Sequence, residues 1–172
     1  LTYEIGKLSL AGIVERFDNK SEEDKNKATM VYSLSATYDF EVAKAFFGYQ
    51  YANRFHSLDQ LEDVWVSGKG MNQNAFTLGA EVPAAGGTFK VAANYGFGKV
   101  KSADGVVVDD TKLSNDKFNR FTVGAAYEYP LSKRTFVYGW GAYATAGKMF
   151  KEKAVEENFK SWSLGLGLHH TF

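Results

Sequence analysis

The chain has 172 residues with 17 Gly, 10 Tyr, 14 Phe, 2 Pro and no Cys, and its 20 basic residues balance its 20 acidic residues. A formal net charge of zero argues against nucleic-acid binding, which needs a basic face. The lack of Cys excludes disulfides, thiolate metal sites and a cysteine nucleophile. No apolar run approaches the ~18 residues of a helical membrane span. If the chain crosses a membrane, it must do so as a closed β-barrel.

Apolar and polar residues alternate with a period of two in successive segments, which predicts an all-β, antiparallel fold. The predicted strands cover eight segments, preceded by a stub of another strand at 1–5: 7–17, 29–40, 43–55, 76–82, 89–95, 120–129, 135–142 and 162–168. Each strand has an apolar face, carried for example by Leu34, Phe47 and Leu78, and a face of small or polar residues. In the last two strands, the apolar face is expected to hold Phe136, Tyr138, Trp140 and Ala142 together with Trp162, Leu164, Leu166 and Leu168.

The predicted connections alternate between short and long. The short ones are 39–42, 83–87 and 130–133, and the long polar ones are 18–28, 56–72, 100–117 and 147–161. All long connections fall at one end of the strands, an arrangement typical of outer-membrane barrels. No domain boundary is indicated, so residues 1–172 are expected to form a single barrel segment.

Side-chain volume decides which face meets lipid. The polar faces are rich in Gly, Ala, Ser and Thr, which are too small to fill a barrel interior but suited to lining water. The apolar faces place aromatic residues near the strand ends, as an aromatic girdle does. These features predict a transmembrane β-barrel, with a soluble lipocalin-like barrel as the alternative.

Two stretches resemble the general porin family of Gram-negative bacteria. Leu131-Ser132-Lys133-Arg134-Thr135, followed by Tyr138, is similar to the family's penultimate periplasmic turn, and the strand from Leu166 to Phe172 is similar to its terminal strand. The residues around the 39–42 turn resemble a family hairpin more loosely. The resemblance implies a sixteen-stranded barrel of which this chain is the second half, with Phe172 as the assembly signal. It also implies a homotrimer in the cell outer membrane that contacts the lipid bilayer, lipopolysaccharide, the barrel assembly machinery, and small polar solutes and ions.

Eight strands alone would leave two unpaired edges, which is costly in hydrocarbon. Either the chain is truncated, or it is a small closed barrel of eight strands. The start at Leu1, in the middle of the alternating pattern and without Met or a signal segment, indicates a mature or truncated chain. The stub at 1–5 favours truncation.

Charged and polar residues on the predicted polar faces are the candidates for function. Lys7, Lys44, Lys90, Arg54 and Arg120 outnumber Glu15, Glu81 and Glu128, so the wall is expected to be mildly basic and weakly anion-preferring. The pore-lining candidates are Lys44, Gln50, Arg54, Glu81, Lys90, Asn94, Arg120 and Glu128.

No catalytic, metal or cofactor site is predicted. His56 lies near Asp59, but the sequence has no Gly-x-Ser-x-Gly elbow. His169 and His170 are adjacent in a strand and should point to opposite faces. The acidic runs 22–24 and 109–110 are interpreted as solvated loop tips rather than cation sites. The sequence thus favours a passive diffusion channel for small hydrophilic solutes and ions, with a small structural or adhesive barrel, or a barrel enzyme, as alternatives.

Overall fold

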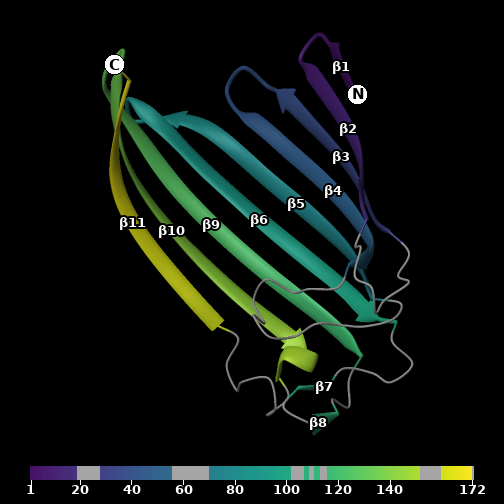
Figure 1. The fold of residues 1–172 in the computed structure, drawn as a ribbon. Helices are drawn as coiled ribbons and strands as arrows, with labels where there is room; N and C mark the ends of the chain where they lie inside the picture. The colour runs from purple at the N-terminus through teal and green to yellow at the C-terminus, as the bar shows by residue number, and fades with distance from the viewer. Residues whose placement is uncertain are drawn as a thin grey trace.

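The computed structural model describes residues 1–18, 28–55, 70–101, 107–108, 111–112, 116–151 and 160–171. Nine strands form one antiparallel sheet in sequence order (Figure 1). They are β1 (Thr2–Ile5), β2 (Leu8–Phe17), β3 (Thr29–Asp39), β4 (Lys44–Phe55), β5 (Met71–Ala84), β6 (Gly87–Val100), β9 (Lys117–Ser132), β10 (Thr135–Lys148) and β11 (Lys160–His170). The eight predicted strands and the predicted stub are therefore confirmed. β1 and β11 form the two edges of the sheet, which is not closed.

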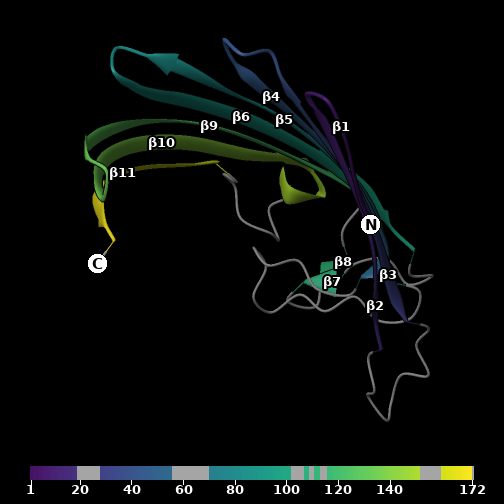
Figure 2. The ribbon, with the colours of Figure 1, turned by 90° about the horizontal axis from the view of Figure 1, so that it is seen from above.

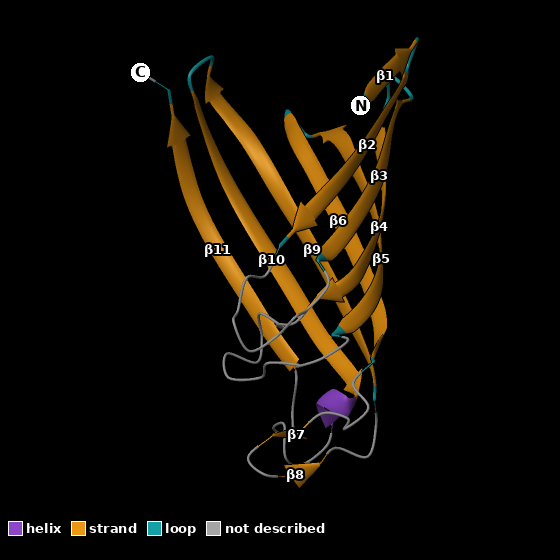
Figure 3. Ribbon diagram, turned by 45° about the vertical axis from the view of Figure 1, so that its right-hand side comes forward, coloured by secondary structure: helices purple, strands orange, loops and turns teal. Residues whose placement is uncertain are grey.

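The ends of several strands differ from the prediction. β5 and β9 continue through Pro83 and Pro130, which leaves two-residue turns at 85–86 and 133–134. At 85–86 both residues have positive φ (48° and 80°), as a type I′ hairpin turn requires. The predicted 100–117 connection contains a small hairpin of β7 (Val107–Val108) and β8 (Thr111–Lys112), and the 147–161 connection contains the short helix η1 (Met149–Lys151). Figure 3 shows the short turns together at one end of the sheet, the turn end.

The sheet is strongly curved, and η1 lies on its concave side (Figure 2). The Phe150 ring in η1 contacts the Phe118 ring of β9, with ring centroids 6.1 Å apart. Side chains two positions apart in a strand lie on the same face, so Phe118 shares a face of β9 with Arg120. The polar faces of the strands are therefore concave, and the apolar faces are convex.

Most of the fully buried side chains gather at the end of the concave face away from the short turns, the loop end. They are Met71, Val100, Phe118, Met149 and Phe150. Met71 and Val100 are direct partners in the register of β5 and β6. At this end η1 packs against β9 and β10.

The convex face keeps large apolar side chains exposed. Leu78 is 62% exposed and Leu166 is 91% exposed. Aromatic residues of this face lie near both ends of the strands. Those toward the loop end include Tyr32, Tyr51, Phe76, Tyr95, Phe121, Tyr143 and Trp162, and those toward the turn end include Tyr38, Phe89, Tyr127 and Tyr129. Within the described residues, no helix is long and apolar enough to cross a membrane.

The predicted orientation of the strand at 135–142 is wrong. Trp140 pairs with Ala126 and Tyr138 with Glu128, so both share the concave face with the polar residues of β9. Leu164 and Leu166 instead pair with Gly141 and Gly139 on the convex face. The prediction failed because the bulky residues of this segment lie at the even positions, which are concave, whereas most of the odd, convex positions are small.

Candidate functional site

The concave face is ordered in rows, because residues directly opposite in the register lie side by side on one face. A row of charged residues near the turn end runs from Asp39 through Lys44 and Glu81 to Lys90. It continues through Ala126 to Trp140. Acidic and basic residues thus alternate across four neighbouring strands before the row becomes apolar.

Lys90 lies between two carboxylates. Its Nζ is 2.8 Å from Glu128 Oε2 and 3.6 Å from Glu81 Oε1. Lys44 Nζ is 4.0 Å from Asp39 Oδ2. These side chains are about one-third to one-half exposed, so each pair contributes at most about 1 kcal/mol to stability. Their main effect is therefore on the local field rather than on folding.

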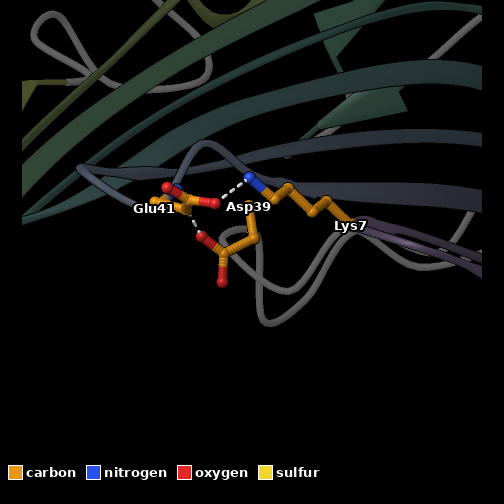
Figure 4. Close-up of polar contacts among 3 residues, drawn as sticks. All are labelled: Lys7, Asp39 and Glu41. Atoms are coloured by element: carbon orange, nitrogen blue, oxygen red, sulfur yellow. Dashed lines mark hydrogen bonds and ion pairs between the residues drawn. The ribbon is translucent and has the colours of Figure 1, made fainter.

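Lys7 and Glu41, in the turns after β1 and β3, extend the charged row toward the edge of the sheet. The row, these two residues and Glu128 are called the charged band below. Lys7, in the β1–β2 turn, forms an ion pair with Glu41, and Figure 4 shows Asp39 beside them. Asp39 Oδ1 accepts a 2.8 Å hydrogen bond from the Glu41 backbone N–H. That bond supports the left-handed conformation of Glu41, whose φ is 71°.

The charge balance of this band differs from the sequence-based count, which left out Asp39 and Glu41. Three lysines (Lys7, Lys44 and Lys90) face four carboxylates (Asp39, Glu41, Glu81 and Glu128). The band therefore carries one excess negative charge, and its lysines are all paired.

Rows closer to the loop end are polar and mostly uncharged. Gln50 Nε2 donates to Ser33 Oγ at 3.1 Å, and Asn94 Nδ2 donates to Thr77 Oγ1 at 2.8 Å. Arg120 lies on the same face, where its register partners are Gly96 and Ala146. No carboxylate of the described residues lies within salt-bridge distance of Arg120.

Arg54 lies at an irregularity of β4. The pairing of β4 with β5 shifts register between Asn53 and Phe55, and Arg54 has a φ of 61°. Its backbone carbonyl accepts a 2.6 Å hydrogen bond from the Thr29 hydroxyl. Because a bulge interrupts the alternation, the period of two does not assign Arg54 to the concave face. The other seven pore-lining candidates lie on that face by register, and their lining of a pore stays a prediction.

A hollow of about 440 Å³ lies in the concave wall between the charged band and the middle of the strands. Phe46 and Trp140 lie at opposite sides of it, and Glu81 and Lys90 line its edge. Its floor consists of small residues, among them Gly79, Ala92, Gly124 and Ala142. Sequence reasoning missed Trp140 here, because it placed that ring on the other face.

The loop end carries a separate group of charges. Lys99 Nζ is 2.9 Å from Asp116 Oδ2. This hydrogen bond lowers the pKa of the Asp116 carboxyl, and the neighbouring Lys117 charge acts in the same direction. Asp116 thus stays ionised at any pH where the chain would ordinarily function.

The histidines of β11 lie as predicted, with His169 opposite Phe136 on the concave face and His170 opposite Thr135 on the convex face. The described part of the chain holds no group of three or more His, Asp or Glu side chains arranged to bind a metal ion. His56, Asp59, the acidic runs 22–24 and 109–110, and Phe172 lie outside the described residues.

Comparison with known proteins decides the family. Residues 1–148 match the family of Gram-negative porins. The chain belongs to this family. Together with the all-strand fold, this places the porin segment in the Gram-negative outer membrane as part of a β-barrel.

An outer membrane porin protein of Bordetella pertussis is similar to the whole porin segment, with 29% identity. The segment spans 45% of the length of that relative.

Proposed function

We propose that this porin segment forms part of the wall of a closed barrel through which small hydrophilic solutes and ions diffuse passively across the outer membrane. The observation that carries the proposal is the division of side chains between the two faces. The convex face offers hydrocarbon an apolar surface with aromatic residues toward both ends, and the concave face carries hydroxyls, amides and ion pairs. Water-filled porin barrels divide their side chains in this way.

The direction of the edge strands supports completion by further strands. β1 and β11 run the same way, because an odd number of antiparallel strands spans the sheet. A closed, fully antiparallel barrel therefore needs an odd number of additional strands between them. Seven more would give the sixteen that the resemblance implies. The relative is more than twice as long as the segment, which leaves room for such strands in a protein of that length.

The proposal includes the partners that accompany such a barrel. Three copies assemble as a homotrimer. Lipopolysaccharide and phospholipid cover the convex surface that remains exposed, and the barrel assembly machinery recognises Phe172. The channel performs no turnover chemistry. These steps rest on family resemblance.

Bilayer recordings of the complete porin test the channel. Stepwise conductance increases are expected in KCl. Gly124→Phe should lower the unitary conductance because Gly124 lies on the concave face, whereas Ala125→Phe, on the convex face of the same strand, should leave it unchanged. A folded protein without conductance steps, or an equal effect of the two variants, would contradict the proposal.

A further inference from the structure

Three aromatic residues follow one another along the concave face of β10. Phe136, Tyr138 and Trp140 occupy every second position, and Phe136 also stacks on His169 of β11 at 4.8 Å. This face was expected to be polar and small. Its rings therefore need an explanation beyond the ordinary lining of an aqueous channel.

Two of these rings, those of Trp140 and Tyr138, lie against glycines of β11. A Cβ placed on Gly165 would lie 2.9 Å from Trp140 Cζ2, and one placed on Gly167 would lie 2.7 Å from Tyr138 Cε1. Such close approach means that each ring covers the backbone of the neighbouring strand. Trp140 still keeps 40% of its surface exposed. It thus offers an open aromatic surface at the edge of the hollow.

The floor beside Trp140 has no side chain larger than a methyl group in one row across four neighbouring strands. That row runs through Gly79, Ala92, Gly124 and Ala142. A planar solute could therefore rest against the wall next to Trp140 without a steric clash. The hollow's volume falls within the range of sites for small organic molecules.

Negative charge lies next to the ring. Glu128 is the direct partner of Tyr138, which places it diagonal to Trp140 at a spacing of about 7 to 8 Å between Cα atoms. Glu128 and Glu81 share the single Lys90 cation, so one carboxylate charge of the three groups is uncompensated. An exposed Trp face beside an excess carboxylate is the combination that attracts an organic cation.

We propose that the hollow is a subsite for ring-bearing organic cations, which stack on Trp140 while their ammonium group approaches Glu128. The inference rests on the proposed channel, since the solute must reach the concave face. Anionic ring compounds are disfavoured because both lysines of the charged row, Lys44 and Lys90, are paired with carboxylates. Cations without a ring lose the contact with Trp140.

The aromatic rings also shield the glycine backbone, a purely structural role. That role predicts no dependence on the charge or shape of a solute. The test therefore needs a readout that depends on both.

The experiment measures block of single channels of the complete porin in KCl. Benzyltrimethylammonium supplies a ring and a cation, tetramethylammonium supplies a cation alone, and benzoate supplies a ring with the opposite charge. We expect transient block with benzyltrimethylammonium at concentrations at which the other two give none. Trp140→Ala should weaken this block about 3- to 30-fold, in line with the usual strength of cation–π contacts.

Trp162→Ala is the matched control, because Trp162 lies on the convex face of the neighbouring strand and should leave the block unchanged. Glu128→Gln keeps the ring and removes the excess charge, so it should weaken the block and reduce its salt dependence. If Trp140→Ala does not fold, Glu128→Gln and the three probes still decide the matter.

Equal block by benzoate, or equal effects of Trp140→Ala and Trp162→Ala, would overturn the subsite. So would normal conductance with no block by benzyltrimethylammonium, which would leave the channel itself standing. Absence of conductance in the folded wild-type porin would instead overturn the proposed function.

Discussion

The contact between Trp140 and Gly165 makes Gly165→Ala an informative substitution. The added methyl group would lie 2.9 Å or less from atoms of the indole ring, which is rigid and cannot bend away at one end. The ring would have to leave its place over β11. Overpacking of this kind costs about 1 to 3 kcal/mol.

The control is Gly48→Ala, also on the concave face, where the nearest atom to the new methyl is Thr77 Cβ at an ordinary 3.5 Å. The free energy of unfolding of Gly48→Ala should be unchanged or higher by up to about 0.4 to 1 kcal/mol, because Ala restricts the unfolded chain more than Gly does. Equilibrium urea unfolding of the complete porin in lipid vesicles, followed by electrophoretic mobility, measures both. Combining Gly165→Ala with Trp140→Ala should recover at least about 1 kcal/mol relative to additivity. If Gly165→Ala costs no more than Gly48→Ala, and Trp140→Ala gives no recovery, Trp140 does not cover Gly165.

Two further predictions concern the faces and the charged band. Leu166→Arg, which places a charge at an exposed convex position, should destabilise the barrel by about 2 to 4 kcal/mol, whereas Thr122→Arg on the concave face should mainly alter conductance; equal folding penalties would favour a soluble barrel. Lys90→Met leaves Glu81 and Glu128 without their shared cation, so the reversal potential in a salt gradient should shift toward cation preference. That shift should shrink in high salt, while stability changes by less than about 1 kcal/mol; an unchanged reversal potential would place these groups outside the limiting section of the channel.

The period-two pattern was sufficient to predict the strands and most of their faces. It succeeded where every second residue is clearly polar, as in the strand with Ser33 and Ser35. In a regular strand the face of one residue determines the face of all the others. It failed in β10, where Phe136, Tyr138 and Trp140 suggested an apolar outer face. The glycines of β11 explain the difference, because Gly165 and Gly167 accommodate these rings on the concave side.

The sequence alone did not predict which side chains contact each other across neighbouring strands. Alternation placed Lys90, Glu81 and Glu128 on one face, but only the register shows that Lys90 lies between the two carboxylates. The bulge at Arg54 interrupts the alternation without a Gly or Pro to mark it. Short elements such as η1 carry too few residues for a periodic signal.

Labelling of single cysteines tests the central claim, that the polar concave face meets water and the apolar convex face meets lipid. The segment has no native Cys, so neighbouring pairs on β6 and β10 can be compared directly in the complete porin in lipid vesicles. With a membrane-impermeant maleimide, Asn94→Cys and Ala142→Cys should react, whereas Ala93→Cys and Tyr143→Cys should stay unmodified. Reaction of Ala93→Cys and Tyr143→Cys with protection of the other two would show that the faces are reversed.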